Sequence, residues 1–407
     1  MNSEVSNIKE NSSSIWRNKV FSYFFLASCI SLIGNSMVTL VLPLWVMKIT
    51  NSPLLVSGVN IAIATAAILF APITGTLADR MSRRKLMIVA DVIRGIVMIL
   101  IAVIAFNNKM LYILLLLLLI IRSLGSSLFT PASNAALVTY VEEKHIQQAI
   151  TLRQISVQII SVAIPVMASF LISIFSFHGV FVLDALTFFI SFLILMKIKF
   201  PRELKVEKKK PFYEDFKEGF SIINNNNKSL KTLLMSAAVI NLLGAACMLS
   251  LQVIVVREMD LSTQWYSIVF AVSPIGILIG AFITKKIRAY KTITTAFIFT
   301  AIMGIFNAAM GTTLNPILFS VYYFLSGIAF GVSNVYFGVL YRKLIPNEVQ
   351  GRFYGLLNSL LLVSTPVGIA ITGYSLESIS ASILFIIIGI ITFLVSVISC
   401  LIMNKSR

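Results

Sequence analysis

Long apolar runs dominate the sequence and restrict what the chain can fold into. A bilayer core of about 30 Å is crossed by about 20 apolar residues in a helix, and runs of suitable length follow one another along the chain. The twelve runs lie at 20–47, 54–78, 86–106, 110–140, 147–174, 178–197, 231–256, 264–284, 291–311, 314–341, 350–373 and 379–403. A closed barrel would need strands of alternating polarity, which the unbroken apolar stretch 111–121 excludes. We therefore expect an all-helical membrane protein with twelve membrane-spanning helices.

The distribution of Lys and Arg indicates how these helices are oriented. With the amino terminus inside the cell, roughly 27 of the 33 basic residues fall on the cytoplasmic side, as is typical of cytoplasmic loops. The outer side keeps Lys48, Lys109 and Arg257. The net charge of +17 therefore reflects membrane topology, and nucleic acid is not an expected partner. We expect both termini to lie in the cytoplasm.

One long polar stretch divides the chain into halves of similar size. We expect a tail at 1–17, a six-helix bundle at 18–197, a linker at 198–230, a second six-helix bundle at 231–403 and a tail at 404–407. Apolar residues recur every three or four positions between 212 and 223, which predicts an amphipathic helix on the cytoplasmic surface. This helix serves either as a brace for the linker or as a site for a partner or lipid. Weak similarity between the halves, at an offset of about 200 residues, favours an internal duplication with a central cavity.

A dense group of charges lies between the second and third runs. The charged residues Asp79, Arg80, Arg83 and Arg84, which follow Gly75, cannot enter hydrocarbon, so this hairpin marks the membrane surface. Glycine permits close helix approach, the aspartate can cap a helix end, and the arginines can pair with a carboxylate on a neighbouring bundle. These residues are expected either to latch one conformation or only to anchor the loop inside the cell.

Several further motifs narrow the interpretation. They are Asp91-Val-Ile-Arg94, Arg122-Ser-Leu-Gly125 with Phe129-Thr-Pro131, Asp184-Ala-Leu-Thr-Phe188, Asp215-Phe-Lys-Glu-Gly219 and Gln350-Gly-Arg352. Together with the charged hairpin, these motifs resemble the macrolide-efflux branch of the drug:proton antiporters in the major facilitator superfamily. The resemblance implies the major facilitator fold, with export of amphipathic compounds from a bacterium in exchange for protons. It also implies a multi-pass protein of the bacterial cytoplasmic membrane, and we expect a monomer.

Charged residues inside the apolar runs are the candidates for proton coupling. Arg122 lies about halfway along its run, where an unpaired charge is costly, so it should face a wet cavity or an anionic partner. The resemblance associates an arginine in this helix with proton coupling; the alternative is an arginine bonded to backbone carbonyls. Asp184 is an embedded carboxylate that either carries the proton or serves as a structural cap. Asp91 is its rival, although with Arg94 it more readily forms a structural network that supports the hairpin.

Isolated polar and aromatic residues near the middle of the runs are candidates for contact with a substrate. They are Asn35, Gln158, Asn241, Tyr322, Tyr323, Asn334, Tyr336 and Asn358. Each of them is as readily a hydrogen-bonding link between helices as a ligand contact. His145 and His178 lie too far apart in sequence to indicate a metal pair.

The sequence also lacks the motifs of other energy sources. It contains no phosphate-binding Gly-x4-Gly-Lys loop and no nucleophile with a partnered base, so we expect neither an ATP-driven pump nor an enzyme. No cofactor is expected, and the energy should come from the proton gradient. The favoured interpretation is that the protein exports macrolide-like drugs. The alternatives are an exporter of an endogenous peptide, siderophore or lipid, and a receptor or scaffold that transports nothing.

Overall fold

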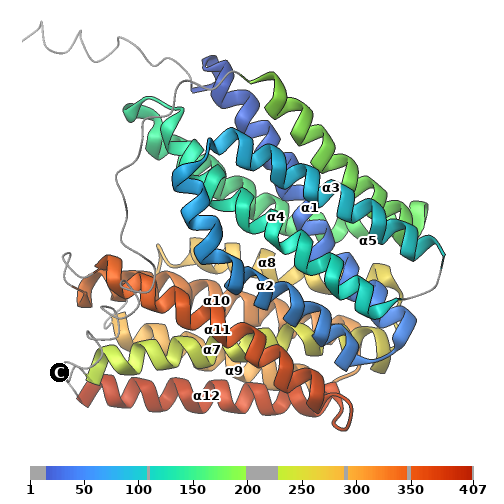
Figure 1. Ribbon diagram of the computed structural model, residues 1–407. Helices are drawn as coiled ribbons and strands as arrows, with labels where there is room; N and C mark the ends of the chain where they lie inside the picture. Colours follow the sequence, from blue (N-terminus) through green and yellow to red (C-terminus); the bar gives the residue numbers. More distant parts are fainter. Residues whose placement is uncertain (1–14, 108–110, 199–227, 288–291, 346–349, 406–407) are drawn as a thin grey trace, which may run out of the picture.

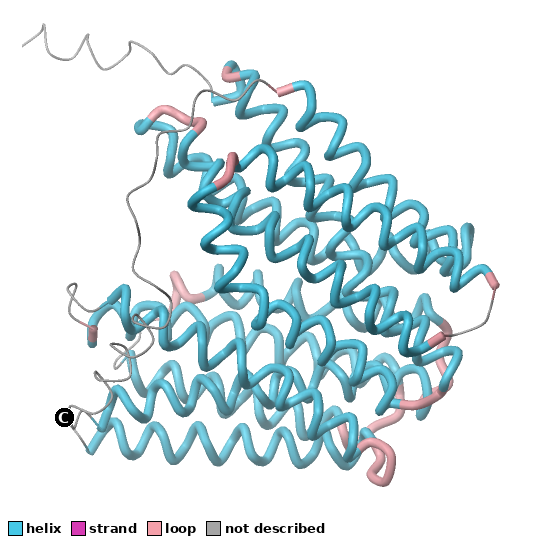
Figure 2. The backbone as a smooth tube through the Cα atoms, in the orientation of Figure 1, coloured by secondary structure: helices cyan, strands magenta, loops and turns pink. Residues whose placement is uncertain are grey.

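The computed structural model describes residues 15–107, 111–198, 228–287, 292–345 and 350–405. Within these ranges, the side chains at 78–80, 138, 166, 169, 263, 351 and 352 lie outside the description. The described backbone is helical throughout, with short loops between the helices (Figure 2). The expected amphipathic helix at 212–223 lies outside the described residues.

Long helices follow the predicted runs closely. They are α1 (Lys19–Thr50), α2 (Pro53–Arg80), α3 (Arg83–Phe106), α4 (Tyr112–Thr139), α5 (Ile146–Lys197), α7 (Lys228–Val253), α8 (Thr263–Ile283), α9 (Thr292–Met310), α10 (Pro316–Leu344), α11 (Gln350–Ser375) and α12 (Ala381–Lys405). Short helical turns lie at Ile15–Arg17 and Glu143–His145, and a π-helical turn at Ile254–Glu258 extends α7. Eleven helical stretches in the described chain are long and apolar enough to cross a membrane. The remaining predicted run, 147–174, is helical and forms the first part of α5.

Local sequence explains why the helices begin and end where they do. The Asn18 side chain accepts a hydrogen bond from the backbone N–H of Phe21 and caps the start of α1. At the other end of α1, Asn51 adopts a left-handed conformation with φ of 50°, which asparagine tolerates better than most residues. Ser52 then caps α2, and Pro53 occupies its first turn. The chain therefore reverses direction between two membrane helices within two residues.

The predicted break between the fifth and sixth runs takes the form of a sharp kink. Helix α5 is continuous over 52 residues except at Ser176, where φ is 56° and ψ is −179°. Ala149, near the start of α5, and Leu195, near its end, belong to the same buried cluster. A straight helix would separate these residues by about 70 Å at 1.5 Å per residue. The two parts of α5 therefore run in opposite directions.

The helices before and after the central linker form two groups, which Figure 1 shows diverging toward one side. We call the side that carries Ile198, Lys228 and the chain's carboxyl end the linker end, and the opposite side the far end. At the far end one buried cluster contains residues from both groups, such as Leu42 and Val46 of α1 with Val253 and Tyr266. There α2 packs against α11, and α5 packs against α8.

The two groups separate at the linker end. Among the described residues, the cluster around Phe21, Met87 and Leu195 is formed by the first group alone. The clusters around Phe353 and around Phe297 contain only residues of the second group. The structure is therefore closed at the far end and splayed at the linker end (Figure 1).

Candidate functional site

The charged hairpin forms the junction between α2 and α3 at the linker end. Arg83 donates hydrogen bonds to the carbonyl oxygen of Ala135, at 3.1 Å, and to the hydroxyl of Thr139 at the end of α4. Arg84 donates to the carbonyl oxygens of Leu195 and Met196, at 3.0 and 2.6 Å. Cations suit helix carboxyl ends because the last carbonyl groups lack partners within the helix. These bonds tie α3 to α4 and α5 within one group and do not reach the other group.

The structure tests the expectation for Gly75 in the hairpin but not the expectation for Asp79 and Arg80. A Cβ atom added to Gly75 would meet nothing within 4 Å, so the close helix approach expected there is not made in this structure. Gly75 instead borders a cavity described below. The side chains of Asp79 and Arg80 lie outside the description, and their latch role stays a prediction.

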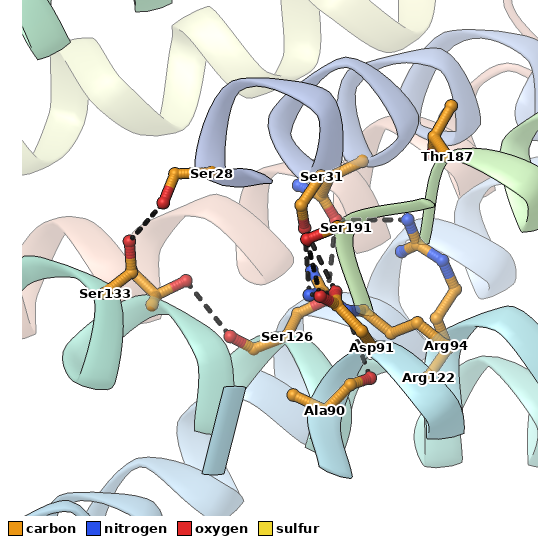
Figure 3. A network of polar contacts seen from close by, with 12 residues as sticks. Ser28, Ser31, Ala90, Asp91, Arg94, Arg122, Ser126, Ser133, Thr187 and Ser191 are labelled. Carbon is orange, nitrogen blue, oxygen red and sulfur yellow. Dashed lines mark hydrogen bonds and ion pairs between the residues drawn. The ribbon is translucent and has the colours of Figure 1, made fainter. Parts of the chain in front are cut away.

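Asp91 and Arg94 form a buried ion pair inside the first group (Figure 3). Their closest atoms, Asp91 Oδ1 and Arg94 Nη2, are 2.5 Å apart, and exposure is 0% for Asp91 and 2% for Arg94. Ser31 of α1 and Ser191 of α5 donate to the two carboxylate oxygens, at 3.3 and 2.7 Å. Every oxygen of this carboxylate therefore has a partner, as a buried charge requires.

The guanidinium group of Arg94 makes further contacts besides the ion pair. It also donates to the Ser31 hydroxyl at 3.0 Å, and its Cζ lies 4.4 and 4.5 Å from the ring centroids of Phe129 and Phe188. Such contacts between a cation and aromatic ring faces are stabilising when both groups are desolvated. The Asp91–Arg94 pair therefore links α1, α3, α4 and α5 as a structural network.

Arg122 is buried in α4, with 3% of its surface exposed. Its Nη2 donates to the Asn35 side chain of α1 at 3.0 Å, whereas its buried Nε has no hydrogen-bond partner among the described residues. The alternative of an arginine bonded to backbone carbonyls is not what the structure has, since its described hydrogen bond goes to a side chain. Arg122 and Asn35 both border an open cavity of about 430 Å3, lined by residues of α1, α2 and α4.

Asp184 is fully buried in the second part of α5, and its environment differs from that of Asp91. Neither of its carboxylate oxygens receives a hydrogen bond from the described part of the chain. It interacts electrostatically with Arg122 and Arg94, and it does not line the cavity that Arg122 borders. In the first group, the Asp184 carboxylate therefore lacks a described hydrogen-bond partner and interacts with Arg122, which borders a cavity.

The second group contains a larger cavity of about 490 Å3. It is lined by Ala237, Ile240, Asn241, Gly244, Ala245 and Met248 of α7, Thr300 of α9, Phe330, Ser333, Asn334, Phe337 and Tyr341 of α10, and Leu357, Leu361 and Thr365 of α11. None of these described lining residues carries a charge. A cavity of this size with few polar groups is typical of a site for a small organic molecule.

The predicted substrate contacts fall into different places. Asn35 borders the cavity of the first group, and Asn241 and Asn334 border the larger one. Tyr323 lies beside a smaller cavity of about 150 Å3. Tyr322 packs against the buried cluster and stacks on Phe306.

The other three candidates lie away from these cavities. Tyr336 is buried and donates from its hydroxyl to the carbonyl oxygen of Ile287, at 3.0 Å, which indicates a structural role in this conformation. Gln158 and Asn358 are exposed and line none of the three cavities described above.

The sequence analysis did not predict the glycines that leave space for the buried charged side chains. A Cβ atom on Gly34 would come within 2.5 Å of Asp184 Oδ1, and one on Gly125 within 2.9 Å of Arg94 Cγ. It also missed Ser31 and Ser191, because two serines on distant helices give no pattern in the sequence. A usable signal existed only for the glycines, each of which lies inside an apolar run and so invites a packing explanation.

Comparisons with known proteins agree with this architecture. The chain is 28% identical over 400 residues to the uncharacterized MFS-type transporter YfiS of Bacillus subtilis (strain 168), covering 95% of this chain and 94% of that protein. It is 22% identical over 401 residues to Macrolide efflux protein A of Streptococcus pyogenes, covering 96% and 97%. The resemblance to the macrolide-efflux branch thus extends over nearly the whole chain.

Solved structures show the same fold. A bacterial homologue of the iron transporter ferroportin in an inward-facing state matches with a TM-score of 0.74 at 17% identity, covering 97% of this chain and 99% of that one. A bacterial homologue of the human lysosomal transporter Spinster matches with a TM-score of 0.72 at 16% identity, covering 97% and 99%. The sequence profile of the Major Facilitator Superfamily matches residues 24–367. The chain therefore belongs to the Major Facilitator Superfamily and is a multi-pass membrane transporter, not an enzyme.

Proposed function

We propose that this transporter exports amphipathic drugs, macrolide-like antibiotics first, from a bacterial cell in exchange for protons. The similarity to Macrolide efflux protein A along nearly the full length supports the substrate class. The excess of basic residues at the linker end supports placing that end in the cytoplasm, with the chain in the cytoplasmic membrane. The protein acts as a monomer and takes its energy from the proton gradient.

The unsatisfied carboxylate of Asp184 is the observation that carries the proposal. A buried carboxylate without hydrogen bonds is costly, and natural proteins keep such groups where a change of protonation is used. Arg122 is the cation that interacts with this carboxylate, so a movement of one relative to the other would change how readily Asp184 exchanges a proton.

Alternating access links this proton to the solute. The two groups of helices act as six-helix bundles that rock about their interface. In the splayed form, solute enters from the cytoplasm, and Asp184 releases its proton inward. Closure at the linker end opens the far end, where the solute leaves and a proton from outside returns to Asp184. Arg122 couples the two events because it borders a cavity on one side and interacts with Asp184 on the other.

The test uses everted membrane vesicles with an acidic lumen, in which export appears as drug uptake. We expect the wild type to accumulate radiolabelled erythromycin and to release protons from the lumen as it does so. A protonophore, which dissipates the proton gradient by itself, should abolish the drug uptake. Asp184→Asn should reduce gradient-driven uptake to the level of protein-free vesicles while keeping exchange of drug down its own gradient.

Asp260→Asn is the matched control. It makes the same chemical change at an exposed position with φ of 50°, a conformation that asparagine tolerates, and it should behave as the wild type. Gradient-driven uptake by Asp184→Asn at the wild-type rate would overturn the coupling role. Failure of the wild type to move any macrolide, with transport of a cellular peptide, siderophore or lipid instead, would overturn the drug substrate.

A further inference from the structure

The cavity in the second group has walls without charge among the described residues, although the transporter carries buried charges elsewhere. The buried ion pair Asp91–Arg94 and the buried charged residues Arg122 and Asp184 all lie in the first group. Neither carboxylate lines either of the two larger cavities, and the charged side chain described in the smaller of them is Arg122, a cation. A ligand in these cavities therefore meets no described carboxylate.

The larger cavity offers aromatic faces and a few polar groups. Phe330, Phe337 and Tyr341 of α10 line it together with Met248, an adaptable apolar side chain. The exposed surfaces of Gly244, Phe330 and Asn334 show that the cavity opens to the surface of the molecule. Its shape and lining suit an organic ligand with an apolar or aromatic body.

Asn241 and Asn334 decide which hydrogen bonds a ligand in this cavity can make. The Asn241 Nδ2 donates to the Leu361 carbonyl, the Ser364 hydroxyl and the Thr365 hydroxyl, at 3.0, 2.9 and 2.8 Å. Both of its donor hydrogens are thereby occupied by α11, and its side-chain oxygen remains as an acceptor. Asn334 makes no hydrogen bond in the described structure and offers both its amide oxygen and its amide nitrogen to the cavity.

A permanent cation would be poorly stabilised here. Ring faces attract a cation, but this attraction is weaker than the hydration that an ion loses when it is removed from water without a counter-charge. An uncharged molecule avoids this cost and keeps the aromatic contacts.

We propose that the cavity of the second group binds the exported solute in an uncharged form, as an amphipathic molecule with an apolar body and a hydrogen-bond donor for Asn241. Permanent cations bind more weakly than uncharged molecules, and weakly basic drugs bind as their free bases. This inference rests on the proposed export function for the identity of the solute, but its binding test does not depend on transport.

The experiment measures binding to the purified full-length protein in nanodiscs at neutral pH, with a scintillation proximity readout. Tritiated chloramphenicol is the uncharged aromatic probe with hydrogen-bond donors, and tritiated tetraphenylphosphonium is the permanent aromatic cation. We expect the wild type to bind chloramphenicol about tenfold or more tightly than the cation, which corresponds to about 1.4 kcal/mol. Phe337→Ala should weaken chloramphenicol binding.

A variant that gains affinity for the cation, set beside a matched control, provides the decisive comparison. Asn334→Asp adds a carboxylate to the cavity without changing side-chain size, and it should raise affinity for the cation by about tenfold. Asn358→Asp adds the same charge at an exposed position on α11 that does not line the cavity and makes no hydrogen bond with the described part of the chain, and it should leave both affinities unchanged.

Three results would overturn the inference. Wild-type protein that binds the cation as tightly as chloramphenicol, or that binds neither probe, contradicts an uncharged-ligand site. An equal effect of Asn334→Asp and Asn358→Asp places the recognition outside the cavity. Loss of proton-driven drug uptake in the vesicle assay, with the binding preference intact, would instead remove the proposed function and leave this site standing.

Discussion

Two buried carboxylates lie in the same group of helices, yet they have opposite environments. Asp91 receives hydrogen bonds from Ser31 and Ser191 and pairs with Arg94. Asp184 receives none from any described residue. A satisfied buried charge stabilises a structure and is costly to alter, whereas an unsatisfied one is available for a change of state. The same residue type therefore serves structure at one position and, as we propose, proton transfer at the other.

Neutral substitutions at the two aspartates should therefore differ in stability. Asp91→Asn leaves Arg94 buried without a counter-charge, and we expect it to lower the free energy of unfolding by about 3 to 5 kcal/mol. Asp184→Asn removes an unpaired charge and should leave the melting temperature unchanged or raised. Thermal unfolding of both variants in the same detergent measures the difference. A larger loss of stability in Asp184→Asn than in Asp91→Asn would contradict these assignments.

The sequence identified the buried charges but not their partners. Asp91, Arg94, Arg122 and Asp184 are conspicuous because charges are rare within apolar runs. Which of them are satisfied depends on residues contributed by distant helices, such as Asn35 for Arg122. Hydropathy also does not indicate which face of a helix borders a cavity.

Glycines control how closely α8 and α10 pack. A Cβ atom on Gly276 or Gly280 of α8 would collide with the backbone of α10, and one on Gly327 or Gly331 of α10 with the backbone of α8. The contact is reciprocal, so the two helices meet backbone to backbone along several turns. Small residues at such positions are the usual means of tight helix association in membranes, where dispersion contacts replace the hydrophobic effect.

Addition of one methyl group should test this contact. Gly331→Ala forces the helices apart, because the atoms it meets belong to the backbone of Ile277 and cannot rotate away, and it should destabilise the protein by about 1 to 3 kcal/mol. Gly244→Ala is the matched control, since a Cβ atom there meets nothing within 4 Å. Thermal unfolding should separate the two variants. Equal melting temperatures would show that the α8–α10 contact is looser than described.

Most helices were predictable because length and apolar composition nearly determine a membrane span. The position of the chain reversal within α5 could be predicted from the sequence, but its backbone conformation could not. The sequence placed a break between 174 and 178, whereas the structure makes the turn at Ser176 by a single left-handed residue without a loop. Hydropathy reports where a chain lies in the bilayer and carries no information about backbone dihedral angles. Likewise, no property of the sequence fixed which end of the molecule is splayed.

At the scale of the whole molecule, polar contact between the two groups occurs at the far end. Glu377, after α11, accepts hydrogen bonds from the Ser52 hydroxyl at 2.9 Å and from the Leu54 backbone N–H at 3.1 Å. A carboxylate at the amino end of α2 is favourably placed relative to the helix dipole. Beside it, Gly373 of α11 packs directly against Ser57 of α2. These contacts hold the far end closed and must separate if the far end opens.

Covalent linkage across this contact should therefore stop the transport cycle. In a background with Cys29, Cys247 and Cys400 replaced by alanine, the pair Ser52→Cys and Glu377→Cys should react with a short bifunctional thiol reagent that contains a reducible disulfide. We expect the linked protein to bind solute, because the linker end remains splayed, but not to accumulate drug in everted vesicles. Reduction of the linkage should restore uptake, and each single-cysteine variant should remain active after the same treatment. Drug accumulation at the wild-type rate by fully linked protein would contradict a cycle in which the far end opens, since solute would then cross without separation of α2 from α11.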